Sequence, residues 1–324
     1  MPGNEAPAEG GSRHPAIGRR SACIPLLVAA AAMVACAPPA APHGRTVRDG
    51  LDRVVVVPSR IERVVSLAPS VTETLVELGF GDRLVGISDF CVPPPDRPVR
   101  RVGGLLNPDL EVIRTLHPDV LIGTTSGNDP ALASQAEALG RPLYILNTPD
   151  VAAVLASVES LADLLGEAGR GERLAADLRR RLAAVERRVA GRERPRILFV
   201  VWAEPLVVPG SGAFLTDAIR RAGGDSVTAD QAAAHPTFSV ESAVALKPDV
   251  ILTTEENAGF AAAVRTDPAW ASVPAVRNAR VAVVGNAVVR PGPGVVGGIE
   301  EMAGLLHPDA RDPAGAHDAP EPRP

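Results

Sequence analysis

The chain has 324 residues and a hydrophobic content of 46%, which is enough for two domains that each bury a core of their own. The formal net charge is −5 at pH 7, so the chain has no overall basic field that would attract nucleic acid. We therefore expect a folded protein with no nucleic-acid partner.

The first 36 residues predict a lipoprotein signal peptide. Arginines precede an apolar run over residues 24–35, which is too short for a comfortable membrane span. The run closes on Met33-Val34-Ala35-Cys36, which resembles the bacterial lipobox with Met in place of the usual Leu. This resemblance implies that Cys36 is acylated, and that an exported protein is membrane-anchored and faces the periplasm or the cell exterior. An ordinary signal, cleaved near Ala35 or Ala37, is the alternative.

Pro, Ala and Gly dominate the next residues, and we expect a flexible tether over residues 37–60. An N-terminal α/β lobe is predicted over residues 61–148. It begins with a strand at 63–68 and a helix from Pro69 to residue 78, in which Ser70 is the expected N-cap and Glu73 its capping-box partner. Further strands are predicted at 84–87, 120–122 and 143–146, and helices at 110–116 and 131–139.

Residues 149–192 show helical spacing only and predict linker helices. The second of these, about 20 residues from Gly171, would span about 30 Å and could cross from one lobe to another. A C-terminal α/β lobe is predicted over residues 193–308, with strands at 196–202, 250–253 and 281–284. We expect residues 309–324 to form a disordered tail.

An internal repeat relates the two lobes. The stretch at residues 107–125 returns at 239–255, and each copy reads as a short helix, a Pro-Asp corner and a continuous apolar run. Alignment through the Pro-Asp corners places Glu111 on Glu241. The sequence therefore predicts an α/β fold with two Rossmann-like lobes, each with a parallel sheet, joined by a single long helix. A ligand cleft is expected between the lobes, outside the carboxyl ends of the strands.

Several segments together resemble the helical-backbone (class III) substrate-binding proteins of ABC importers, and most of all their vitamin B12-binding branch. They are Arg63-Val-Val-Ser-Leu-Ala-Pro-Ser-Val-Thr-Glu73, Leu84-Val-Gly-Ile-Ser88 with Cys91, Val102-Gly-Gly104, and the Leu-His/Lys-Pro-Asp-Val stretch in both lobes. The resemblance implies a monomeric, non-enzymatic protein without a cofactor. It would capture cobalamin or a related corrinoid and deliver it to a permease dimer with its ATPase subunits.

Glu111 and Glu241 lie in the first turns of equivalent predicted helices, behind Asp109 and Ser239 as expected caps. Acidic residues are favourable near any helix N-terminus, so the residues alone favour a purely local role. The resemblance implies instead that one Glu protrudes from each lobe and pairs with arginines of the permease.

Aromatic residues make up only 3% of the chain, so their placement is informative. Phe90, Trp202, Phe214 and Phe238 fall after predicted strands or before helices, where their faces could hold a flat ring system. Packing in the core is the alternative for each. The expected ligand-binding set comprises these four residues together with Pro69, Ser70, Cys91, Gly104, Thr125 and Arg290.

Other functions remain open from the residues. An iron-siderophore or haem-binding protein of the same fold is the first alternative, although haem usually requires an axial Tyr or His, and Tyr144 lies within a strand pattern. An enzyme with paired α/β lobes is a remote alternative, because the chain has no dinucleotide fingerprint, P-loop or nucleophile elbow. His235 has no predicted partner, and we expect no metal site.

Overall fold

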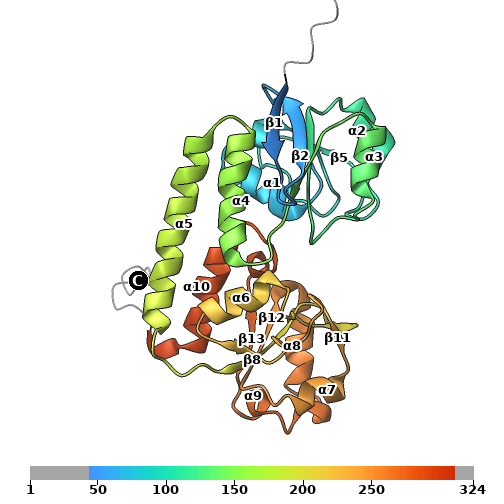
Figure 1. The fold of residues 1–324 in the computed structure, drawn as a ribbon. Helices are drawn as coiled ribbons and strands as arrows, with labels where there is room; N and C mark the ends of the chain where they lie inside the picture. The colour runs from blue at the N-terminus through green and yellow to red at the C-terminus, as the bar shows by residue number, and fades with distance from the viewer. Residues whose placement is uncertain (1–43, 311–324) are drawn as a thin grey trace, which may run out of the picture. The chain divides into compact units, whose positions relative to one another are not determined.

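The computed structural model describes residues 44–310, which belong to one compact unit (Figure 1). The predicted signal peptide, the proposed lipidation site Cys36 and most of the expected tail lie outside the described residues. No helix between residues 44 and 310 combines the length and apolarity that a membrane crossing demands.

A β-hairpin occupies most of the segment for which a flexible tether was predicted, so that prediction is wrong for residues 44–58. Strands β1 (Gly44–Arg48) and β2 (Val54–Pro58) pair antiparallel. Val55 and Val57 point into the core, where they are 9% and 1% exposed. Strand β2 reads Val-Val-Val-Val-Pro, so its sequence shows no alternation of apolar and polar residues. The alternation that is typical of a half-buried strand appears only in the burial of every second valine.

The hairpin is fixed to the N-terminal lobe at its turn. The backbone N–H of Gly50 donates to the carbonyl of Ile145 at 2.7 Å. The Asp49 carboxylate is fully buried and accepts hydrogen bonds from Arg53 Nε at 2.9 Å and from the Ile145 N–H at 3.3 Å. The turn therefore covers the free edge of the last strand of the lobe's sheet.

The N-terminal lobe is built on a five-stranded parallel sheet with the order β5-β4-β3-β6-β7. Its strands are β3 (Val64–Ser66), β4 (Leu84–Ile87), β5 (Arg100–Arg101), β6 (Val120–Thr124) and β7 (Leu143–Leu146). Its helices are α1 (Pro69–Glu77), α2 (Leu110–Thr115) and α3 (Leu132–Ala138), with a 3-10 turn, η1 (Gly81–Arg83). The alternation of strands and helices is as predicted.

The start of α1 differs from the predicted capping box. Ala68 is the N-cap residue and makes no side-chain cap bond, while Pro69 occupies the first turn. Ser70 lies inside the helix and is 5% exposed. A proline in the first turn lacks the N–H that a cap would satisfy and already has a helical φ, so the helix begins one residue before the predicted cap could act.

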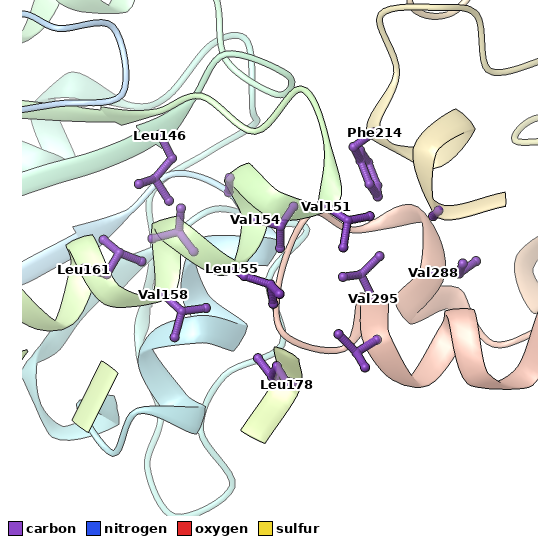
Figure 2. Close-up of a cluster of buried hydrophobic side chains, with 14 of the residues drawn as sticks. Leu146, Val151, Val154, Leu155, Val158, Leu161, Leu178, Phe214, Val288 and Val295 are labelled. Atoms are coloured by element: carbon purple, nitrogen blue, oxygen red, sulfur yellow. The ribbon is translucent and has the colours of Figure 1, made fainter. Parts of the chain in front are cut away.

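Two helices connect the lobes: α4 (Val151–Leu164) and α5 (Ala168–Val189). At 22 residues, α5 is about 33 Å long. The two helices pack along each other, and Gly171 is required at their crossing, because a Cβ there would lie 2.6 Å from the Cβ of Ala162. Figure 2 shows the buried side chains of α4, with Leu178 of α5 among them.

The C-terminal lobe repeats the parallel design with the strand order β10-β8-β12-β13. These strands are β8 (Arg196–Val200), β10 (Asp225–Ser226), β12 (Val250–Thr254) and β13 (Val281–Val284), and a separate antiparallel pair consists of β9 (Leu206–Val207) and β11 (Thr237–Phe238). The helices are α6 (Phe214–Arg221), α7 (Val240–Ala245), α8 (Ala258–Val264), α9 (Pro274–Arg277) and α10 (Val295–Leu306), with 3-10 turns η2 (Glu255–Asn257), η3 (Pro268–Trp270), η4 (Asn286–Val289) and η5 (Pro308–Ala310). Helix α5 packs against α10, so it connects the two α/β lobes as predicted.

Candidate functional site

The Pro-Asp corners of the repeat make matching contacts in the two lobes. Asp119 accepts hydrogen bonds from the backbone of Arg63 at 2.8 Å, and Asp249 accepts one from the backbone of Arg196 at 2.9 Å. The residues two positions before each aspartate, His117 and Lys247, both have positive φ, at 44° and 48°. Because the corners are equivalent, the carboxyl ends of β3 and β6 in one lobe correspond to those of β8 and β12 in the other.

Glu111 and Glu241 begin equivalent helices and are exposed. Asp109 caps α2 by accepting from the Val112 N–H at 3.0 Å, and Ser239 caps α7 by accepting from the Ser242 N–H at 3.2 Å, as predicted. The Glu111 side chain is 76% exposed and pairs with Arg114 in the next turn. Hydrogen bonds from its own backbone N–H and from Ser239 lower the pKa of the Glu241 carboxyl, so it is ionised at neutral pH. Each lobe therefore presents an anionic side chain at the same place on its surface.

Exposed apolar side chains follow the carboxyl ends of β4 and β5 in the N-terminal lobe. Phe90 is 62% exposed, Val92 65% and Leu106 66%. Cys91 between them is 3% exposed, and its Sγ lies 3.1 Å from the hydroxyl of Ser88. Of the predicted ligand-binding residues in this loop, Phe90 has a free ring face, whereas Cys91 is a small buried residue that supports the loop.

A groove of about 660 Å³ begins at the carboxyl ends of β8 and β12 in the C-terminal lobe and continues along α8 as far as Asp267 and Trp270. Trp202, just after β8, is 52% exposed on its wall, and its indole N–H donates to the carbonyl of Glu204 at 2.9 Å. That bond fixes the orientation of the ring while leaving its apolar surface uncovered. Phe260 and Trp270 also line the groove, in an edge-to-face pair with ring centroids 5.9 Å apart.

Phe260, which is partly exposed, was not among the predicted site residues, whereas Trp270 behind it is 2% exposed and belongs to the core of the lobe. In a chain with so few aromatics, Phe260, six residues after the end of β12, was the available signal. Phe238, which was predicted, packs half-buried against the same side of the lobe. It supports the groove region rather than standing free at a rim.

Phe214 is not at the rim of a cleft, which corrects the prediction. It is 7% exposed and belongs to the main core, where Figure 2 shows its ring beside Val151 and Val295. The first turn of α6 faces α4 and α10, and an aromatic residue there fills the space among three helices.

The remaining predicted residues of the N-terminal lobe are mostly covered by protein. The backbone of Ser70 is approached by Gly292 of the other lobe, where a Cβ would lie 3.4 Å from the Ser70 carbonyl oxygen. Pro69 is half-buried beside it. Gly104 packs against the Asn107 side chain, and the exposed Thr125 donates to Asn147 Oδ1 at 3.0 Å. Pro69, Ser70 and Gly104 therefore offer little free surface, whereas Thr125 is exposed with its hydroxyl bonded to Asn147.

Arg290 joins the lobes. Its Nη1 donates to Glu73 Oε1 of α1 at 2.6 Å, and its Nη2 lies 3.6 Å from Glu256 Oε1. The predicted donor at the cleft is therefore already engaged by two carboxylates. Among residues 44–310, no group of three or more His, Cys, Asp or Glu side chains is arranged to hold a metal ion.

Comparison with known proteins identifies relatives over this whole region. Residues 64–288 match the family described as periplasmic binding protein. The vitamin B12-binding protein of Vibrio cholerae is 28% identical over 255 residues, which cover 77% of this chain and 90% of that protein. The ABC transporter substrate-binding lipoprotein YvrC of Bacillus subtilis is 26% identical over 274 residues, or 82% of this chain and 86% of that protein.

Solved structures give the same fold. The apo haem-binding protein RhuT of Roseiflexus sp. RS-1 superposes with a TM-score of 0.68 at 27% identity, over 78% of this chain and all of that one. The vitamin B12-binding protein BtuF of Vibrio cholerae also gives 0.68, at 26% identity, over 78% of this chain and 99% of that one. Two α/β lobes with parallel sheets, a long connecting helix and a family match over most of the described residues lead to one conclusion: this chain belongs to the periplasmic binding protein family and is a non-enzymatic, extracytoplasmic substrate-binding protein of an ABC importer.

Proposed function

We propose that the protein binds cobalamin or a related corrinoid between its two lobes and delivers it to the permease. The observation that carries the proposal is the pair of apolar surfaces at the strand ends. Phe90 is exposed on one lobe, and the groove of about 660 Å³ beside Trp202 lies on the other. Burying an aromatic face against a flat macrocycle removes about 150–250 Å² from water per side chain, which is a large binding contribution.

The relatives support a macrocyclic ligand but divide between two kinds. The Vibrio cholerae relative is a vitamin B12-binding protein, whereas RhuT is a haem-binding protein with the same TM-score as BtuF. Backbone similarity therefore does not separate the ligands, and the side chains of this chain must do so.

An axial protein ligand is the feature that separates haem from corrinoid. Haem iron is usually held by a Tyr or His side chain of the protein. The single tyrosine, Tyr144, is 3% exposed within β7, and burial raises the pKa of its hydroxyl, so it is no anionic ligand at a cleft. His307 is also buried, against the carbonyl of Gly223. The burial of Tyr144 and His307 supports a corrinoid over haem, while the exposed His235, on the loop before β11, is the side chain that haem iron would have to use.

The test is a titration of the purified protein with cyanocobalamin, cobinamide, haemin and ferric siderophores, read by calorimetry and by the shift in melting temperature. We expect saturable binding of the corrinoids and a higher melting temperature in their presence, because a ligand that binds only the native state stabilises it. Tighter binding of haemin or a ferric siderophore than of either corrinoid would overturn the proposal.

We propose further that the protein is anchored through an acylated Cys36 and contacts the permease through Glu111 and Glu241. Support for the anchor comes from the residues 33–36 and from the lipoprotein YvrC among the relatives. Support for the contacts comes from the equivalent, exposed positions of the two carboxylates. Charge complementarity at such a contact would orient the two lobes on a two-fold related pair of subunits.

A further inference from the structure

We propose that Glu73 is a specificity-determining residue, which occupies Arg290 and thereby makes the cleft select ligands without free carboxylates. The inference rests on the proposed function, because it concerns the ligand class of the same cleft. It adds to that function a reason, in this chain's own residues, for rejecting anionic ligands.

Arg290 is already bound to carboxylates of the protein. An arginine after the last strand of a lobe is well placed to bind a ligand carboxylate in a bidentate manner. Here Nη1 donates to Glu73 at 2.6 Å, Nη2 lies 3.6 Å from Glu256, and the Arg290 and Glu73 side chains are each only 29% exposed. A ligand anion would have to displace a carboxylate that is already in place and partly shielded from water.

The group formed by Arg290, Glu73 and Glu256 keeps a negative net charge. One guanidinium faces two carboxylates, so Arg290, Glu73 and Glu256 together carry a formal charge of −1. Glu204 and Glu255, which follow β8 and β12, are also exposed near these strand ends. A ligand carboxylate placed beside Arg290 would meet like charge here, which costs affinity even before any hydrogen bond is broken.

In the other lobe, Arg101 lies at the strand ends and is also bound to the protein. Arg101 ends β5, and its Nη1 donates to the backbone carbonyls of Ser88 at 2.8 Å and Cys91 at 2.6 Å. This nitrogen is therefore used to hold the loop that carries Phe90. Arg101 and Arg290 thus each have donors committed to the protein itself.

A ligand whose periphery carries amides suits such a cleft better than one with carboxylates. Amides hydrogen-bond to carboxylates and to backbone groups without adding negative charge. Glu73 then acts in two ways, as the partner that holds Arg290 and as a barrier to anions. The chemical class selected is an amide-bearing macrocycle without free carboxylates.

The experiment compares ligands that share a ring and differ in charge. The affinities of cobinamide and of cobyric acid, which bears a free carboxylate, are measured for the wild type and for Glu73→Gln. A second pair, haemin and its dimethyl ester, provides the same comparison on a porphyrin. We expect the wild type to prefer the member of each pair that lacks a free carboxylate. Glu73→Gln should shift the ratio toward the carboxylate by about tenfold, or about 1.4 kcal/mol.

Two further variants separate this role from a structural one. Glu256→Gln is the matched control, because Glu256 is farther from Arg290 and should shift the ratio less. Adding Arg290→Gln to Glu73→Gln should abolish the gain, since the gain depends on a freed guanidinium. An unchanged ratio in a folded Glu73→Gln protein would overturn the inference. If the wild type binds no corrinoid, the proposed function fails, while a gain of haemin binding in Glu73→Gln would still support the inference.

Discussion

Asn128 and Asn257 make equivalent hydrogen bonds in the two lobes. The side-chain amide of Asn128 donates to the carbonyl of Leu67 at 3.0 Å, and that of Asn257 donates to the carbonyl of Val201 at 3.0 Å. Each bond ties the segment after one strand to the backbone at the end of its neighbour. The repeat therefore extends past the Pro-Asp corners to the strand ends, where the ligand is proposed to bind.

This equivalence gives the first prediction, for Glu111 and Glu241. Replacing both with Ala should abolish uptake and leave ligand affinity intact, because both side chains are exposed at helix starts. Each single change should reduce uptake less than the pair. Changing both to Arg should be worse than Ala, since like charges would then meet across the interface. Uptake is measured in cells and affinity by titration of the purified variants.

A local role at the helix N-termini predicts a different result for the same double variant. The melting temperature would fall slightly, while transport would stay normal. Near-normal uptake at wild-type protein levels would therefore refute the docking role. Glu137→Ala, which removes an exposed carboxylate on α3, is the matched control for altered surface charge.

The second prediction separates two aromatic residues that the sequence grouped together. Trp202→Ala should weaken ligand binding by about 1–3 kcal/mol, in proportion to the apolar area lost, with little change in stability. Phe214→Ala should instead lower the free energy of unfolding by about 3–5 kcal/mol, because the ring is buried among three helices. Calorimetric titration and thermal unfolding of both variants check this, and unchanged affinity in Trp202→Ala would remove Trp202 from the site.

The third prediction concerns the anchor. Cys36→Ala should release the protein from membranes into the soluble exported fraction, because acyl chains rather than a spanning helix would hold it. Fractionation of cells that express the two forms measures this. Continued membrane association of Cys36→Ala, after cleavage of the signal, would contradict the lipoprotein assignment. Cys91→Ala is the matched control and should remain with the membrane.

The fourth prediction tests the hairpin. Asp49→Ala should lower the free energy of unfolding by about 2–4 kcal/mol, because it leaves Arg53 and several backbone N–H groups of the turn without their buried acceptor. Denaturant unfolding measures the loss. Asp96→Ala removes an exposed carboxylate and should change stability little; an equal loss in both variants would show that the hairpin turn contributes nothing specific.

The sequence predicted the two-lobe fold well because its signals were periodic and repeated. The buried strands, the helix over residues 171–189 and the caps Asp109 and Ser239 all follow from local pattern, and the structure has them. The hairpin was missed because its support is distant in the chain. Asp49 and Gly50 bind Ile145, almost a hundred residues away, and composition alone favoured a tether.

The site was predicted less well, because position after a strand does not say which way a side chain points. Phe90 and Phe214 both precede or follow regular elements, yet one ring is 62% exposed and the other 7%. Arg290 was expected to bind the ligand, and no local pattern could reveal that Glu73, 217 residues earlier, would hold it. Tertiary packing decides which way these side chains point and which partners they bind, and residue spacing carries no information about it.

The folding of residues 44–58 also sets the length of the segment that links Cys36 to the first strand. Seven residues, 37–43, separate Cys36 from β1, so an acylated Cys36 would hold the first strand within about 28 Å of its lipid, against about 85 Å for a tether that reached residue 60. Because the lipid diffuses in the plane of the membrane, the shorter reach confines the protein to a layer about three times thinner, which raises its local concentration at a permease in the same membrane about threefold. A short link also restricts the orientations of the protein at the membrane. The direction in which the hairpin leaves the lobe therefore helps to decide how the protein meets its transporter.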